Sequence, residues 1–201
     1  PAIYIGQDYK TAFREKFQLE EGSEINGLTP SELCLNSSFS SYRMSGHLER
    51  VLDVSDINTL IPVCSVLKRI PKPGELKALA KRLRLGPGGA YMIRTAPQLQ
   101  DALQQKNWRA WPAQFEIPAP CQQLAGWAID AGFEAIRYRS TKCSTGYCLA
   151  IFPSNIGSDR TYIELADPAA PEVSHTRLDL ETANALCGWD MLGPSQRPSV
   201  A

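Results

Sequence analysis

The sequence is poor in the residues that most often bind metal ions. It contains two histidines, His47 and His175, and its six cysteines form no CxxC pair. Structural zinc sites draw their ligands from closely spaced pairs of cysteine and histidine. We therefore predict no metal site. We also expect the cysteines to be reduced thiols, because a chain of 201 residues buries enough surface to fold without disulfides.

Net charge and long apolar segments are missing as well. Twenty-one basic residues balance 21 acidic ones, which gives no reason to expect nucleic acid as a direct partner. No apolar run approaches the ~20 residues that a membrane-spanning helix needs, so no membrane is expected either. The first residues lack the basic and apolar regions of a signal peptide, which favours a cytoplasmic protein. Because the sequence opens on strand-like residues, we expect a further segment ahead of Pro1.

A strand followed by a helix is predicted at residues 2–17, AIYIGQDYKTAFREKF. Residues 2–6 are rich in isoleucine and tyrosine and end at a glycine, as short strands do. Asp8 suits the N-cap of the helix. Four residues follow with the spacing of a buried helical stripe: Tyr9, Ala12, Phe13 and Phe17.

Tyr4 and Glu15 stand on either side of this strand-to-helix turn. At about 100° per residue, Glu15 lies on the flank of the stripe, where a carboxylate can reach the edge of a cleft. Spacing alone favours the simpler interpretation, a tyrosine in the core and a glutamate in solvent.

A helix and a hairpin are predicted at residues 121–152. The helix CQQLAGWAIDAGF has one apolar side, and Gly132 is well placed to end it. The strand EAIRYRS alternates apolar and basic residues, as a half-buried strand does. The turn TKCSTG and the apolar strand YCLAIF complete the hairpin.

This strand and turn carry four polar residues that together could bind phosphate groups: Arg137, Arg139, Ser140 and Lys142. An exposed strand face with a polar turn explains them as well, and the strand alone favours that explanation.

Strands and helices without a regular alternation predict an α+β fold. Residues 22–47 are rich in serine, glycine and asparagine and predict a loop. RVLDVSD at residues 50–56 predicts another strand, and GELKALAKRLRL at residues 74–85 predicts an amphipathic helix.

Three of these segments, taken in order, resemble the RES domain family. AIYIGQDYKTAFREKF is similar to the family's tyrosine-bearing strand and Thr-Ala-x-x-Glu helix. QLAGWAIDAGFEAIRYRSTKCSTGYCLAIF is similar to its later helix, Ile-Arg-Tyr-x-Ser strand, glycine-containing turn and apolar strand, and RVLDVSD fits its middle strand. The family is named for an Arg, a Glu and a Ser. Glu15 matches the Glu, Ser140 the Ser and Tyr4 the strand tyrosine. The family's Arg belongs to an N-terminal strand upstream of the tyrosine strand, for which this sequence has no counterpart.

The resemblance implies an ADP-ribosyltransferase-like fold, with a mixed sheet core, flanking helices and a helical insertion. We expect the RES-like domain at residues 1–166, the insertion at residues 57–107, and a C-terminal extension at residues 167–201.

The resemblance also implies a toxin-type enzyme that consumes NAD as its substrate, without a metal. It would cleave the nicotinamide–ribose bond as an NAD glycohydrolase, a phosphorylase or an ADP-ribosyltransferase, with water, phosphate or a protein as the acceptor. An antitoxin or immunity protein is the expected partner. The protein would act in the cytoplasm of the cell that makes it, or as an effector delivered into a target cell.

On this interpretation Glu15 stabilises the charge that develops on the ribose or orients the nucleophile. Tyr4 stacks on nicotinamide or hydrogen-bonds a ribose hydroxyl, and Ser140 fixes the amide or the ribose. Three cations neutralise the pyrophosphate: Arg137, Arg139 and Lys142. Two alternatives stay open: a non-catalytic RES-like binding or interaction module that lacks the N-terminal Arg strand, and an enzyme that acts on a different nucleotide.

Overall fold

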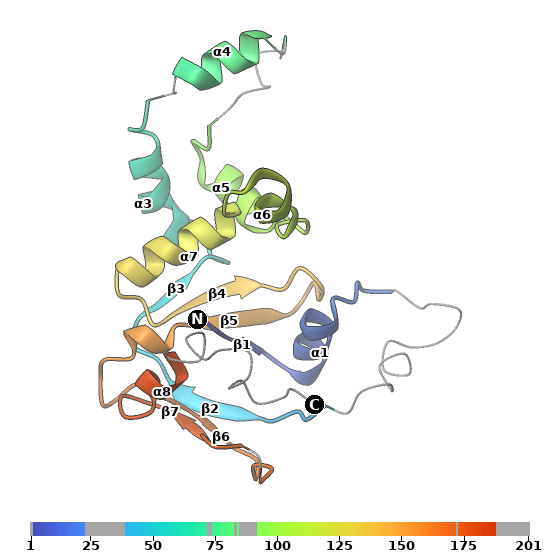
Figure 1. The fold of residues 1–201 in the computed structure, drawn as a ribbon, viewed down its shortest axis with the longest axis vertical. Helices are drawn as coiled ribbons and strands as arrows, with labels where there is room; N and C mark the ends of the chain where they lie inside the picture. Colours follow the sequence, from blue (N-terminus) through green and yellow to red (C-terminus); the bar gives the residue numbers. More distant parts are fainter. Residues whose placement is uncertain are drawn as a thin grey trace. The chain divides into compact units, whose positions relative to one another are not determined.

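The computed structural model describes residues 2–22, 39–71, 74–82, 84, 92–171 and 173–187. The chain forms two compact units, one made of Pro1–Asp53 with Gln122–Ala201 and the other of Val54–Cys121. Figure 1 shows the course of the chain through both. Helices and mixed sheets confirm the predicted α+β class.

The first unit contains a four-stranded sheet in the order β1-β5-β4-β3. Its strands are β1 (Ile3–Gly6), β5 (Tyr147–Ile151), β4 (Ala135–Arg139) and β3 (Val51–Asp53). Strand β5 is antiparallel to both of its neighbours, β1 and β4, and β3 runs parallel to β4. The predicted strand at residues 2–6 and the predicted hairpin are therefore confirmed.

A second sheet of the same unit has the order β2-β6-β7. It consists of β2 (Met44–His47), β6 (Tyr162–Leu165) and β7 (Arg177–Leu178). Residues from both sheets and from α8 (Ala183–Cys187) form one buried apolar cluster: Ala135, Ile151, Ile156, Ile163, Leu178 and Ala183. The predicted loop at residues 22–47 is thus wrong at its end, which is strand β2, and residues 23–38 of it lie outside the described residues.

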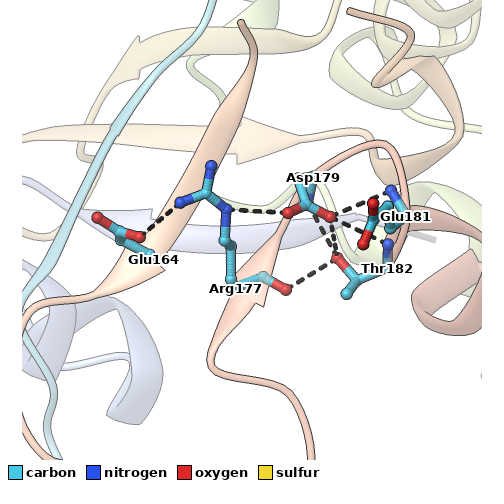
Figure 2. Close-up of polar contacts among 5 residues, drawn as sticks. All are labelled: Glu164, Arg177, Asp179, Glu181 and Thr182. Atoms are coloured by element: carbon cyan, nitrogen blue, oxygen red, sulfur yellow. Dashed lines mark hydrogen bonds and ion pairs between the residues drawn. The ribbon is translucent and has the colours of Figure 1, made fainter. Parts of the chain in front are cut away.

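At the rim of this second sheet Arg177 ties β6 to the turn before α8. Its guanidinium donates to Glu164 at 2.8 Å and to Asp179 at 2.9 Å, as Figure 2 shows. The Asp179 carboxylate also accepts the backbone amides of Glu181 and Thr182, each at 3.1 Å. The hydrogen bond from the Thr182 amide lowers the pKa of Asp179.

Helix α1 (Tyr9–Phe17) begins as predicted, because Asp8 accepts the backbone amide of Thr11 at 2.7 Å. The predicted burial of its apolar stripe is largely wrong. Phe13 is buried, but Tyr9 is 55% exposed and Ala12 is exposed too. The Phe13 ring packs with the rings of Tyr9, Phe17 and Phe39, and Phe17 also packs with Phe39.

Helix α7 (Pro120–Asp130) ends at a glycine, as the sequence predicts. Gly132 has φ +81°, and the next amide, Phe133 N, donates back to the carbonyl of Ala128 at 2.9 Å. A left-handed residue closing a helix in this way favours glycine. The short 3-10 helix η1 (Pro153–Asn155) follows β5. The side-chain amide of Asn155 lies at the end of α7, where it donates to the backbone carbonyls of Ile129 and Phe133.

The second unit is helical. Its described residues include α3 (Ile57–Leu67), α4 (Gly74–Arg82), α5 (Ala96–Leu103) and α6 (Ala110–Phe115). Helices α3 and α5 pack together, and the buried side chains include Leu60, Cys64 and Leu99. The segment predicted as an insertion, residues 57–107, contains three of these helices, and its limits and those at residue 166 stay predictions.

A buried carboxylate joins three distant segments of the first unit. Glu134 is 1% exposed and accepts the backbone amides of Glu49 and Arg50 at 2.7 and 3.0 Å. Its other oxygen accepts the hydroxyl of Thr161 at 2.9 Å. Both carboxylate oxygens of Glu134 act as hydrogen-bond acceptors here. The site therefore needs a side chain with two acceptors and no donor.

Replacing Glu134 with glutamine is expected to lower the free energy of unfolding by about 1–2 kcal/mol. The amide keeps one oxygen for the two backbone amides, but its NH2 group meets the Thr161 hydroxyl, which then loses its acceptor. Urea denaturation measures the change. An unaltered free energy of unfolding would mean that these bonds contribute nothing to stability.

Candidate active site

Two residues predicted to act together, Glu15 and Ser140, meet at the end of α1. The Ser140 hydroxyl donates to Glu15 Oε1 at 2.6 Å, and the Thr141 backbone amide donates to the same oxygen at 3.0 Å. The short O–H···O distance is typical of a charge-assisted hydrogen bond. Residues 125 positions apart are therefore held in direct contact.

Ser140 has no hydrogen-bonding capacity left over in this arrangement. Besides donating its one proton to Glu15, its oxygen accepts the backbone amides of Lys142 at 3.1 Å and Cys143 at 2.9 Å. The side chain is buried, with the residue 8% exposed. A hydroxyl offers one donor and two acceptor positions, so all three are in use.

Glu15, in contrast, keeps one oxygen available. Within the described part of the chain its Oε1 accepts two hydrogen bonds and its Oε2 has no partner. The residue is half-buried. The arrangement therefore fixes the direction of the carboxylate and leaves one acceptor for a bound molecule.

Two glycines let α1 approach closely enough for this contact. A Cβ at Gly6 would lie 2.5 Å from the backbone nitrogen of Ala12, and one at Gly146 would lie 2.3 Å from Thr11 Oγ1. Thr11 is fully buried. The polar side of α1 thus packs on the strand end and on the turn after β4.

Tyr4 is 72% exposed and lies on the sheet face that α1 contacts. It pairs with Ala150 of β5, while Gly6, two residues on, pairs with Cys148. Cys148 in turn pairs with Tyr138 of β4. Directly paired residues share a face, so this face carries an exposed tyrosine, a half-buried one and small side chains between them.

Tyr138 and Cys148 were not among the predicted site residues. Burial, with the nearby Cys148 and Glu15, raises the pKa of the Tyr138 hydroxyl. Burial and then the charge of Glu15 raise the pKa of the Cys148 thiol to about 12. Both groups therefore stay protonated at neutral pH beside the carboxylate. The alternation in EAIRYRS was the available signal, since it places Tyr138 on the side away from the two arginines.

Arg137 and Arg139 lie on the opposite face of the sheet from Tyr4. They pair with Leu149 and Tyr147 of β5, the residues on either side of Cys148. Because neighbouring residues of a strand point to opposite faces, the arginines lie on the face away from Cys148. Arg137 forms an ion pair with Asp53 at 2.8 Å, and both guanidinium groups lie over the Tyr147 ring, at 4.1 and 5.3 Å from its centre. The structure does not bring these two arginines to Glu15.

Lys142, the third predicted cation, forms an ion pair with Glu20 just beyond the end of α1. Its Nζ lies 2.8 Å from Glu20 Oε1, and its side chain is 10% exposed. The next acidic residue, Glu21, accepts the Ser144 amide at 3.3 Å. Hydrogen bonds with Ser144 lower the pKa of Glu21.

Two further polar atoms of α1 are buried without a hydrogen-bond partner in the described residues. They are Thr11 Oγ1 and Arg14 Nη1. Buried polar groups are nearly always paired, so this guanidinium N–H, which lacks a partner among the described residues, is a donor that a water molecule or an anion could use.

Metal ligands and membrane helices were also sought in the described ranges. There, no group of three or more histidine, cysteine or acidic residues is arranged to hold a metal ion. None of the five described cysteines forms a disulfide. No helix in the same ranges has both the length and the apolar character needed to cross a membrane.

Comparison with known proteins gives one match. The model of a family described as the RES domain matches residues 1–180. No curated protein and no solved structure matches the chain. The match includes all three segments on which the sequence resemblance rested, at residues 2–17, 50–56 and 123–152.

Proposed function

Because the chain belongs to the RES domain family, we propose that it is an enzyme that cleaves the nicotinamide–ribose bond of NAD. The family is generally associated with NAD-consuming, toxin-like function. The single observation that supports this reaction best is the oriented carboxylate: Glu15 is held through one oxygen by Ser140 and Thr141 and has the other oxygen to offer.

A carboxylate of this kind suits the chemistry. Loss of nicotinamide leaves positive charge on the ribose, as glycoside hydrolysis does. A fixed negative group beside that carbon lowers the barrier because it does not have to reorganise as the charge develops. Glu15 Oε2 would supply this charge, or would orient the attacking nucleophile.

Tyr4 would provide the aromatic contact. Its ring is 72% exposed on the face that carries the α1 contact, so a planar ring can stack on it without displacing protein side chains. Arg137 and Arg139 would meet the pyrophosphate only if the ligand extended round the strand end, because they face the other way. Their role as phosphate ligands stays a prediction, for which a raised KM for NAD in Arg139→Gln is the test.

The toxicity of such an enzyme determines which partner protein it would need and in which compartment it would act. An enzyme that depletes NAD harms any cytoplasm in which it is active. We therefore propose that the producing cell makes an antitoxin or immunity protein, and that the enzyme acts in a cytoplasm, its own or that of a target cell.

A non-catalytic binding module is the second candidate, and one observation favours it. Glu15 Oε1 already accepts two hydrogen bonds, so the carboxylate also serves as a structural tie between α1 and the turn. In that case NAD or a related nucleotide would bind without being cleaved.

The test is to incubate the purified chain with NAD and to follow nicotinamide release, with and without phosphate and acceptor proteins. We expect release. Free ADP-ribose identifies water as the acceptor, a phosphorylated ADP-ribose identifies phosphate, and a labelled protein identifies transfer. No release combined with a higher Tm in NAD supports the binding module, because a ligand stabilises the state it binds. Neither release nor a Tm shift contradicts both proposals.

A further inference from the structure

Three carboxylates from the end of α1 and the residues after it hold the turn that carries Ser140. Glu15 accepts from Ser140 and Thr141, Glu20 pairs with Lys142, and Glu21 accepts the amide of Ser144. We refer to Glu15, Glu20 and Glu21 together as the carboxylate clamp. Each of them contacts a different part of one short turn, so the clamp fixes the turn against the helix end.

Lys142 connects the clamp to Ser140 in two ways. Its Nζ donates to Glu20 at 2.8 Å, and its own backbone amide donates to Ser140 Oγ at 3.1 Å. The residue that pairs with Glu20 thus also supplies one of the two backbone amides that hold the serine hydroxyl. That hydroxyl in turn donates to Glu15.

We propose that Lys142 is a positioning residue, whose ion pair with Glu20 keeps the turn where Ser140 and Thr141 can orient Glu15. The inference rests on the proposed function. It replaces the role predicted from the sequence, in which Lys142 neutralises the pyrophosphate of NAD.

Burial and charge both favour positioning over phosphate binding. The Lys142 side chain is 10% exposed and its charge is paired. Reaching a phosphate would require the buried ammonium group to leave Glu20, whose own side chain is 45% exposed, and so to lose the partner that compensates its burial. Exposed pairs contribute far less, and the exposed Arg43–Asp167 pair (2.7 Å, Arg43 side chain 82% exposed) provides a natural comparison.

The Glu20–Lys142 pair lies next to the contact between Glu15 and Ser140 along both segments of the chain. Glu20 follows α1, which ends at Phe17, and Lys142 follows Ser140 by two residues. The Glu20–Lys142 pair and the Glu15–Ser140 bond thus join the same two segments at neighbouring points. Together with the hydrogen bonds from the Thr141 amide to Glu15 and from the Ser144 amide to Glu21, the pair restricts the relative orientation of the two segments. Reaction rates depend steeply on such orientation.

Replacing Lys142 with methionine keeps most of the side-chain volume and removes the charge. We expect kcat for NAD cleavage to fall about tenfold, with KM changed less than about twofold, because an interaction felt mainly in the transition state is weakened. The Kd for ADP-ribose, measured by calorimetry, should stay within about twofold. A KM and a Kd that rise tenfold or more would show a phosphate contact and overturn the proposal.

The charge-swapped double variant, Glu20→Lys with Lys142→Glu, restores an ion pair in the reverse sense. It should recover a large part of the kcat lost in each single variant, which loss of a phosphate ligand would not allow. Asp167→Asn, which breaks the exposed pair with Arg43, is the matched control and should leave kcat unchanged. Failure of the swap to recover any kcat, with both single variants impaired, contradicts the proposal.

Hydrogen exchange separates this inference from the proposed function. The Thr141 amide donates to Glu15, so its exchange should quicken about tenfold in Lys142→Met and slow again in the charge-swapped variant. This readout needs no substrate. A wild-type chain without NAD turnover contradicts the proposed function alone, whereas unchanged Thr141 exchange in Lys142→Met contradicts the positioning role alone.

Discussion

Glutamine in place of Glu15 is expected to lower the rate of NAD cleavage on the order of a hundredfold to a thousandfold, the usual effect of removing one preorganised electrostatic group. Glutamine has nearly the same shape, and its oxygen can still accept from the Ser140 hydroxyl at 2.6 Å and the Thr141 amide at 3.0 Å. The other position, Oε2, becomes an NH2 group that cannot stabilise positive charge on the ribose. The tie between α1 and the turn therefore remains while the catalytic charge is lost.

Nicotinamide release at saturating NAD measures the effect, and a thermal melt shows whether the fold is intact. We expect KM to change little, because the lost interaction belongs to the transition state. Glu164→Gln is the matched control: it removes another carboxylate, paired with Arg177 on the second sheet, and should keep full turnover. Full turnover by Glu15→Gln would reject the catalytic role of Glu15 and leave it as a structural tie.

Local features of the fold could be predicted because their causes are local. Asp8 caps α1 through an amide three residues away, and Gly132 ends α7 through its own backbone conformation. The orientation of α1 could not be predicted in this way. Spacing shows which residues share a side of a helix, but not what that side packs against. Here the aromatic side of α1 packs with Phe39, and the polar side faces the sheet and the turn.

Strand β2 could not be predicted from the local sequence at all. All four residues of Met44–His47 are exposed, so no alternation of apolar and polar residues marks them as a strand. They form one because each pairs with a residue of β6, Met44 with Leu165 at one end and His47 with Tyr162 at the other. Pairing partners more than a hundred residues apart leave no trace in a local pattern.

The candidate site likewise combines features that the sequence could predict with features that depend on long-range contacts. The resemblance to the RES domain gave Tyr4, Glu15 and Ser140 as a set, and the structure brings Glu15 and Ser140 into contact. Alternation in the sequence also indicated that Arg137 and Arg139 share a face. Which face this is depends on the register of β1, β5 and β4, and the partner of Lys142 depends on where the chain goes after α1. Both depend on contacts between residues far apart in the sequence, which local patterns do not record.

The close approach of α1 to the sheet gives the second prediction of large effect. Alanine in place of Gly6 is expected to lower the free energy of unfolding by about 3 kcal/mol, because overpacking against backbone cannot be relieved by a rotamer change. The added Cβ would lie 2.5 Å from the nitrogen and 2.7 Å from the Cα of Ala12. Urea denaturation measures the loss, and the same samples report NAD turnover.

Gly126→Ala is the control for this substitution. Gly126 lies within α7, and a Cβ there meets no atom within 4 Å, so alanine should raise the free energy of unfolding by about 0.5–1 kcal/mol. A loss at Gly6 and a gain at Gly126 would attribute the first effect to contact with Ala12 rather than to the change of residue type. Unchanged stability in Gly6→Ala would contradict the close approach.

The position of Glu15 makes Gly6→Ala informative about function as well. Ala12 and Glu15 are three residues apart on α1, so a clash that moves Ala12 away from β1 also moves Glu15 relative to Ser140. Below the unfolding transition the variant should therefore cleave NAD more slowly than wild type, while Gly126→Ala should not. If Gly6→Ala lost stability but kept full turnover, the helix would relieve the clash by pivoting about the Glu15–Ser140 contact, and that contact would be the more rigid of the two.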